Sequence, residues 1–132
     1  MCKGGSETYR LRHKEQDTLT ACLNLLISLE NAGKIVHCDR LNSGKIFVPY
    51  MRKSGRRGGR MIRLCREGTP DGYFILNTGK VIWLEAKRGK AKQRYEQERF
   101  EAKISKLPNH EYWLIRDIDE FIVKLKDLLG DF

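Results

Sequence analysis

Two acidic residues and a lysine stand at a spacing that could support metal-dependent cleavage of phosphodiester bonds. Asp71 closes the run Gly68-Thr69-Pro70-Asp71, and Glu85 and Lys87 flank an alanine at the end of an apolar stretch. Carboxylate oxygens are the ligands that hard divalent cations prefer, and an ammonium group can assist an attacking water. The three residues therefore predict a hydrolytic metal site, provided that the fold brings them together.

A β-hairpin would bring them together. Residues 73–76 form a short aromatic and β-branched run, 77–79 supply turn residues, and 80–87 resume as a strand. Side chains alternate across a strand, so Glu85 and Lys87 share one face with Val81 and Trp83, opposite Ile82, Leu84 and Ala86. Apolar residues on both faces indicate a central strand with the charged pair at its end. A lone Glu-x-Lys is more often a simple ion pair, so this interpretation needs context.

Positive charge supplies that context. The chain of 132 residues has 26 Lys and Arg against 17 Asp and Glu, a formal net charge of +9 that favours a polyanionic partner. The segment 52–66 holds basic residues and no acid: Arg52, Lys53, Arg56, Arg57, Arg60, Arg63 and Arg66. Arginine grips phosphate oxygens bidentately, and interspersed glycines let backbone amides approach. We expect a basic Arg/Gly loop that binds DNA, with a solvated loop that has no ligand as the alternative.

The strongest helical pattern covers residues 15–32. Apolar residues recur there at spacings of three and four: Leu19, Cys22, Leu23, Leu26 and Leu29. Glu15 lies on the same stripe, four residues before Leu19, so its carboxylate can point toward the sheet and join the other two acids. The alternative for Glu15 is a first-turn acid favoured by the helix dipole. Glu30 lies on the stripe near the opposite end, so only one of the two can reach the site.

The remaining pattern indicates one α/β domain over residues 1–132, with a flexible N-terminus at 1–12. Further strands are expected at 34–38, 45–49, 61–65 and 111–115, a turn at 42–44, and helices at 92–107 and 117–129, with Gly130 past the end of the last helix. The four scattered cysteines are expected to be reduced thiols. The histidines are dispersed and form no helical pair of the kind that binds zinc, so a zinc site is not expected. No apolar run approaches the roughly 20 residues of a membrane span, and no secretory signal is evident, so we expect a cytoplasmic protein without a membrane partner.

This order of parts resembles the virus-type replication-repair nuclease (VRR-NUC) domain of the PD-(D/E)xK nucleases. The resemblance extends over residues 15–128 and includes Arg40-Leu41-Asn42-Ser43-Gly44 and Gln97-Glu98-Arg99-Phe100, with its most specific parts in the Gly-Thr-Pro-Asp turn and the Glu-x-Lys strand. It implies a restriction-endonuclease-like core, in which a mixed central β-sheet is flanked by helices.

The resemblance also implies a role for each site residue. Asp71, Glu85 and the main-chain carbonyl of Ala86 would ligate Mg2+ or Mn2+, and Lys87 would position or polarise the attacking water. Glu15 would be the first-helix acid, with Gln16 as the alternative. Gln97 would be the glutamine that follows the Glu-x-Lys strand, with Gln93 as the alternative.

At the level of function, the resemblance implies a metal-dependent, structure-selective DNA endonuclease similar to Holliday-junction resolvases. A homodimer acting on branched DNA in a bacterial or phage-infected cell, in association with the nucleoid, would fit standalone domains of this kind. The other hypothesis is a basic DNA-binding accessory protein whose acids are structural. That protein would bind DNA with a steep salt dependence and show no metal-stimulated nicking.

Overall fold

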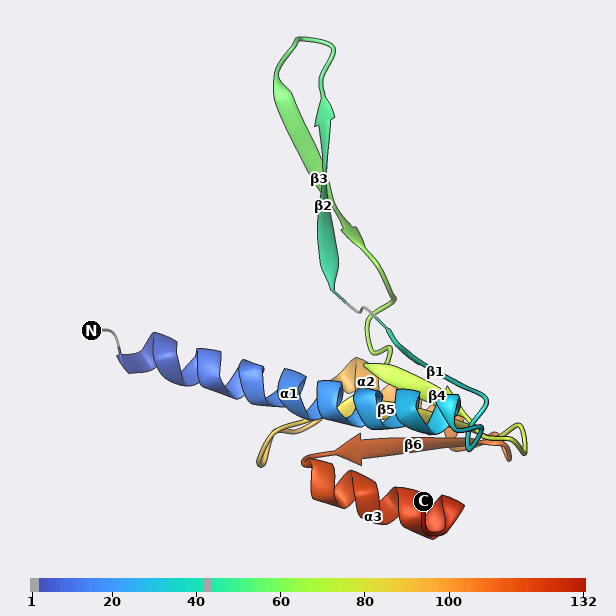
Figure 1. Cartoon of the computed structure of the whole chain (residues 1–132). Coiled ribbons are helices and arrows are strands. Elements are labelled where there is room, and N and C mark those ends of the chain that lie inside the picture. The colour runs from blue at the N-terminus through green and yellow to red at the C-terminus, as the bar shows by residue number, and fades with distance from the viewer. Residues whose placement is uncertain (1–2, 42–43) are drawn as a thin grey trace.

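The computed structural model describes residues 3–41 and 44–132, with side chains from residue 15 onward (Figure 1). Three helices and six strands follow in this order: α1 (Lys3–Asn31), β1 (His37–Arg40), β2 (Lys45–Met51), β3 (Arg57–Arg63), β4 (Gly72–Ile75), β5 (Val81–Ala86), α2 (Tyr95–Ile104), β6 (His110–Ile115) and α3 (Ile118–Leu129). The expected α/β class is confirmed. No helix in the described part of the chain is both long and apolar enough to cross a bilayer.

The main sheet is mixed and has the strand order β1-β4-β5-β6. The β4–β5 pair is the antiparallel hairpin expected from the sequence, closed by a turn in which Gly79 has a φ of 91°. β5 then runs parallel to β6, and α2 provides the crossover that a parallel pair requires. β5 therefore has a neighbour on each side, as the apolar residues on both of its faces predict.

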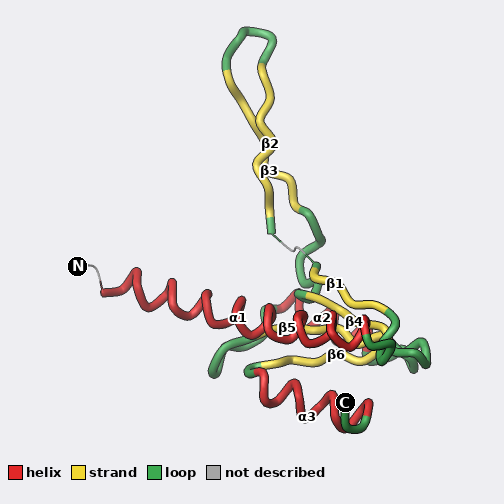
Figure 2. Tube along the Cα trace, in the orientation of Figure 1, coloured by secondary structure: helices red, strands yellow, loops and turns green. Residues whose placement is uncertain are grey.

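Helices cover both faces of this sheet (Figure 2). On one face, Ile82 and Leu84 of β5 join a buried cluster with residues of α1 and α3, including the fully buried Leu26 and Phe121. On the other face, Trp83 packs edge-on against Phe100 of α2, with ring centroids 5.2 Å apart. The alternation of side chains along β5 thus separates a wholly apolar core from a second face that α2 covers.

Three predicted boundaries differ from the structure. α1 begins at Lys3 rather than near residue 15, so residues 3–12, expected to be flexible, are helical. The apolar stripe marks only the part of α1 that packs on the sheet, whereas the preceding turns extend beyond it (Figure 1). The first strand starts at His37 instead of residue 34, because the backbone N–H of Lys34 still bonds the carbonyl of Leu29 at the helix end. α2 covers only part of 92–107, since Arg94 is its N-cap.

The predicted Arg/Gly loop at 52–66 is wrong over residues 57–63, which form β3. The strand expected at 61–65 starts earlier, at Arg57, and ends at Arg63. β3 pairs antiparallel with β2, and the two form a hairpin that projects from the body of the protein (Figure 1). We call residues 45–63 the hairpin arm. Gly59 serves close approach rather than loop freedom, because a Cβ there would lie 1.9 Å from Cζ of Phe47. The turn expected at 42–44 falls mostly on residues outside the described ranges.

Candidate active site

A hollow of about 360 Å³ gathers the residues that the sequence selects for chemistry. Its lining includes Glu15, Asp71, Glu85, Ala86, Lys87 and Gln97, together with Gln16, Leu19, Arg40, Gly44 and Arg94. These residues come from α1, from the end of β1, from the segment just before β2, from the β4–β5 hairpin and its ends, and from the start of α2. The convergence required by the sequence argument is therefore present in the fold.

Asp71 is held between two strands by its own backbone. Its N–H donates to the carbonyl of Leu84 at 2.9 Å, and its carbonyl accepts from the N–H of Leu41 at 2.7 Å. The side chain is fixed as well, because Oδ2 accepts from the N–H of Ala86 at 2.8 Å. Main-chain and side-chain bonds together place this carboxylate beside the end of β5.

The turn before Asp71 has its own physical explanation. Gly68 has a φ of 85°, and a Cβ at that position would lie 2.4 Å from the carbonyl oxygen of Glu96. Glycine is needed there both for the backbone conformation and for the close approach to α2. The hydroxyl of Thr69 donates to the carbonyl of Arg66 at 2.7 Å, and Pro70 is fully buried. The Gly-Thr-Pro-Asp run is thus a rigid connection that delivers Asp71 to the hollow.

Glu85 is the most unusual group in the hollow because it is a carboxylate only 3% exposed. Its Oε1 accepts from Nε2 of Gln97 at 2.7 Å and lies 3.8 Å from Nζ of Lys87. Its Oε2 is buried and has no hydrogen-bond partner among the described residues. An unpartnered buried carboxylate oxygen is costly, so a ligand that satisfies it would be bound with favourable free energy.

Burial dominates the protonation of both acids. It raises the pKa of Glu85 to about 8, and the nearby Asp71 carboxylate adds to the increase, against the opposing effects of Lys87 and Arg94. Burial also raises the pKa of Asp71 above its ordinary value, while the hydrogen bond from Ala86 acts in the opposite direction. Two carboxylates that resist ionisation together form an environment that a cation would relieve.

α1 contributes one of its two stripe acids to the hollow. Oε1 of Glu15 accepts from the backbone N–H of Arg88 at 3.1 Å, which ties α1 to the chain just after β5. Gln16, the alternative, also lines the hollow but is exposed. Glu30 lies elsewhere, where its Oε1 accepts from the N–H of Cys38 at 2.9 Å and pairs with His37. The expectation that only one stripe acid reaches the site is confirmed.

The two candidate glutamines occupy different places. Gln97 lies on α2 and is 3% exposed; its Oε1 accepts from the N–H of Arg94 at 2.8 Å while its Nε2 donates to Glu85. This pair of bonds fixes both the helix start and the carboxylate. Gln93 precedes the helix, and its side chain lies beside the hydroxyl of Tyr112, where it opposes the increase that burial causes in the pKa of Tyr112. Gln97 is the one in contact with the acids.

Sequence reasoning missed two arginines in the lining. Arg40 ends β1 and lowers the pKa of Asp71, and Arg94 lowers that of Glu85, each by its positive charge. Arg40 begins the segment Arg40-Leu41-Asn42-Ser43-Gly44, and Arg94 precedes Gln97 by three residues. In a chain with 26 basic residues, no local signal separates these two from the rest.

The seven predicted DNA-binding residues are all exposed. Most lie on the hairpin arm: Arg52, Lys53 and Arg56 at its turn, and Arg57, Arg60 and Arg63 on β3. Arg63 pairs with Glu67 at 3.0 Å, an exposed pair that contributes little to stability. Arg66 lines a separate hollow beside α2 with Arg99 and Lys103.

As a metal site, the hollow offers the carboxylates of Asp71 and Glu85 beside the backbone of Ala86. These are the oxygen donors that a hard cation prefers. Within the described residues, no group of three or more His, Cys, Asp or Glu side chains is arranged to hold a metal ion.

No protein-family model matches this chain, and neither the curated proteins nor the solved structures include a significant match to it.

Proposed function

We propose that this protein is a metal-dependent endonuclease that hydrolyses phosphodiester bonds in branched DNA. The observation that carries the proposal is Glu85, a buried carboxylate with an unpartnered oxygen in the same hollow as Asp71 and Lys87. The mixed sheet flanked by helices is compatible with a PD-(D/E)xK nuclease of the VRR-NUC type, and we propose that membership on the residue pattern described above.

Asp71, Glu85 and the carbonyl of Ala86 are the groups that would hold Mg2+ or Mn2+. Bound there, the ion would supply positive charge against the negative charge that develops on the phosphate during hydrolysis. The donor set fits this role, because burial raises the pKa values of both acids, and a cation would replace part of the solvation that burial removes. The cation would then favour their ionised forms.

The other residues of the hollow would orient the reacting groups and neutralise the charge of the phosphate. Gln97 fixes Oε1 of Glu85, so the carboxylate keeps one orientation. Lys87, whose side chain is 14% exposed, presents its ammonium group beside the acids, where it would orient an attacking water. Arg40 and Arg94 bring further positive charge to the lining and would draw the phosphodiester toward it.

Branched DNA is the proposed substrate because the chain grips phosphates without a recognisable base-reading module. The exposed arginines and lysines would follow backbone geometry rather than sequence. Cutting both strands of a junction symmetrically requires two sites, so we propose that the protein acts as a twofold homodimer.

A second candidate is a non-catalytic DNA-binding accessory protein. The observation in its favour is that Glu85 is 3% exposed with a pKa raised to about 8, so near neutral pH it is largely protonated in the absence of a cation. Under this hypothesis the acids are a structural cluster that holds α1 and α2 on the sheet.

Cleavage assays with labelled junction, flap and linear DNAs in Mg2+, Mn2+ or Ca2+ distinguish the two candidates. We expect nicking in Mg2+ or Mn2+ and its loss in Asp71→Ala, Glu85→Ala and Lys87→Ala, while DNA binding persists. Asp127→Ala and Lys126→Ala change an exposed acid and an exposed lysine on α3 and are the matched controls. Normal cutting by all three site variants, or no cutting of any DNA by the wild type, would exclude the nuclease.

A further inference from the structure

The hairpin arm exposes large apolar side chains that a free-standing β-ribbon has no core to bury. Those above 40% exposure are Ile46 (45%), Phe47 (60%), Tyr50 (47%), Met51 (66%) and Met61 (58%). β2 and β3 form a two-stranded sheet of their own, separate from the main sheet. Because neighbouring residues of a strand point to opposite faces, these side chains are spread over both faces of the ribbon. Exposed apolar side chains in this number indicate a binding surface rather than a packing defect.

Two aromatic rings on the arm are seated on glycine backbone. A Cβ at Gly59 would lie 1.9 Å from Cζ of Phe47, and one at Gly58 would lie 3.0 Å from Cε2 of Tyr50. Each ring therefore occupies space beside a glycine that the side chain of any other residue at that position would fill. With one side against the backbone and about half or more of the side chain exposed, each ring presents an open face to solvent.

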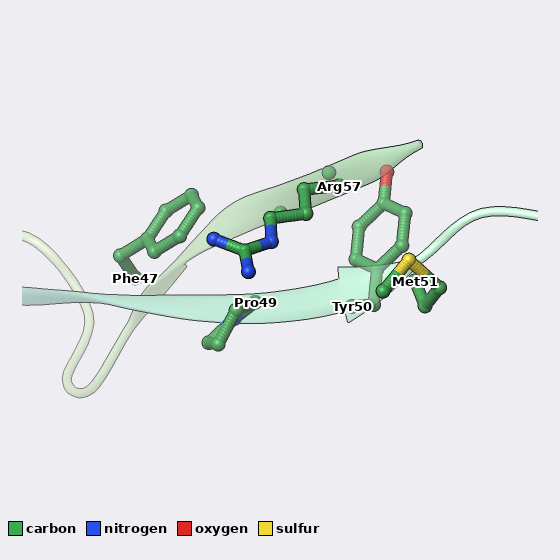
Figure 3. Close-up of a pocket in the computed structure, with 7 residues that line it drawn as sticks. Phe47, Pro49, Tyr50, Met51 and Arg57 are labelled. Atoms are coloured by element: carbon green, nitrogen blue, oxygen red, sulfur yellow. The ribbon is translucent and has the colours of Figure 1, made fainter. Parts of the chain in front are cut away.

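These rings line one shallow hollow of about 680 Å³ on the arm. Arg57 and Met51 contribute to the same lining, and in the view of Figure 3 the Arg57 guanidinium lies between the rings of Phe47 and Tyr50. Flat apolar faces beside a guanidinium match a nucleotide, which has a planar base next to a phosphate.

The charge of the arm selects among possible occupants. Residues 45–63 include seven basic residues and no acid: Lys45, Arg52, Lys53, Arg56, Arg57, Arg60 and Arg63. The arm of a second copy would bring the same positive charge to this surface and be repelled. A nucleic acid brings the complementary charge along with stackable bases.

The arm also rises from the edge of the candidate active site. Gly44 lines that hollow and directly precedes β2, and the N–H of Leu64 donates to its carbonyl at 3.0 Å, which closes the base of the arm. Phe47 follows Gly44 by three residues, about 10 Å along a strand. That span is about three stacked nucleotides, so one DNA strand could occupy both places.

We propose that the hairpin arm binds unpaired nucleotides, with Phe47 and Tyr50 stacking on bases and the arm's arginines contacting the adjacent phosphates. Bases inside a duplex are already stacked on each other, so the arm would favour gaps, flaps and branch points over continuous duplex. This inference rests on the proposed function only in taking DNA as the substrate, and it narrows that substrate to DNA with unpaired bases near the cut.

Fluorescence anisotropy of the full chain in EDTA tests the stacking without any cleavage. The probes are a labelled mixed-sequence oligonucleotide and its duplex. Phe47→Ala and Tyr50→Ala should each weaken single-strand binding roughly 5- to 100-fold, with a much smaller change on the duplex. Phe47→Leu, which keeps an apolar contact but has no π-face, should lose affinity similarly, whereas Phe47→Trp should retain it. Phe132→Ala, at an exposed phenylalanine outside the arm, is the matched control.

The salt dependence separates stacking from charge. Phe47→Ala should leave the slope of log affinity against log salt unchanged, because it removes no phosphate contact. Arg60→Ala should reduce that slope by about 0.7 for a single strand. Loss of a stacking contact should thus lower the affinity without changing the salt slope, whereas loss of a phosphate contact should reduce the slope as well.

Equal losses on single strand and duplex for the aromatic variants, or no loss, would overturn the proposal. So would sedimentation showing that Phe47→Ala converts a dimer to a monomer, because the arm would then be a self-association surface. Absence of nuclease activity in the wild type leaves these metal-free affinities unchanged, so failure of the proposed function is recognised separately.

Discussion

The candidate active site and the hairpin arm are adjacent in space and opposite in physical character. In the site, Glu85 and Gln97 are each 3% exposed and bonded to one another, and Asp71 is fixed by backbone and side-chain bonds. On the arm, Phe47 is 60% exposed and rests on a glycine. One region is held in place by the whole fold, whereas the other depends on a single hairpin.

The difference separates a rigid site, whose side chains have fixed positions, from an exposed arm that extends away from the body of the protein. A reacting group must stay within a fraction of an ångström of its position, which buried hydrogen bonds to a sheet provide. A surface that accepts flexible single strands needs open aromatic faces and charge instead. The two regions also differ in their electrostatics. In the site, burial disfavours the ionised form of Glu85 and raises its pKa. On the arm, the arginines are exposed and no acidic residue neutralises them.

The strongest change is expected in stability, where the same substitution can be compared at a buried and at an exposed phenylalanine. Phe74 of β4 is fully buried, so Phe74→Ala should lower the free energy of unfolding by about 3–5 kcal/mol, whereas Phe47→Ala should change it by less than about 0.5 kcal/mol. Urea denaturation measures both, and Phe74→Leu is the milder variant if Phe74→Ala does not fold. Equal losses would mean that the arm belongs to the cooperative core.

The second effect concerns the pH dependence of stability without metal. The folded state holds a proton on Glu85 up to a pKa of about 8, whereas the unfolded value is 4.5, so this group lowers stability as pH rises from about 4.5 to about 8. Glu85→Gln should remove this loss and unfold a few °C above the wild type at pH 8 and higher in EDTA.

Calorimetry over that pH range measures the difference between wild type and variant. Glu98→Gln, at an exposed position of α2, is the control. Mg2+ should raise the melting temperature of the wild type and leave that of Glu85→Gln nearly unchanged. A variant that unfolds earlier than the wild type at high pH would contradict the assigned environment of Glu85.

The third effect separates the two glutamines. Gln97→Ala removes the hydrogen bond to Glu85 and should reduce metal-dependent cleavage roughly 10- to 100-fold while increasing the metal concentration required. Gln93→Ala should leave both close to wild type. Metal titrations of the nicking rate measure the two variants side by side, and the opposite order would transfer the positioning role to Gln93.

The smallest effect is local to the arm. Gly59→Ala would place a Cβ where the Phe47 ring now lies, so the ring must move while global stability stays within about 0.5 kcal/mol. Single-strand binding should fall, and the loss should vanish when Phe47 is already alanine, because the two residues act as one unit. A full additional loss in the double variant would show that Gly59 acts independently of the ring.

Local pattern was sufficient for much of the main sheet. The β4–β5 hairpin was predictable because its alternation and its turn at Gly79 are short-range features. The apolar stripe of α1 predicted the buried Leu19 and Leu26. The same stripe placed Glu15 at the site, because helical spacing fixes which residues share a face.

The hairpin arm shows where local pattern failed. Gly58 and Gly59 within an arginine-rich segment look like a loop, and nothing in residues 52–60 alternates like a half-buried strand. The strand forms because its partner, β2, is supplied from upstream and its aromatic rings cover the glycines. A pairing of this kind is visible only when both strands are seen together.

The residue pattern alone selects the candidate site residues: two acids and a lysine at hairpin spacing, a surplus of arginine, and a helix stripe that includes Glu15. The packing of the elements brings Gln97 rather than Gln93 to Glu85 and adds Arg40 and Arg94 to the same hollow. The reason is physical, since periodicity fixes which side chains share a face of one element. The distance between faces depends on how α2 and β1 pack on the sheet.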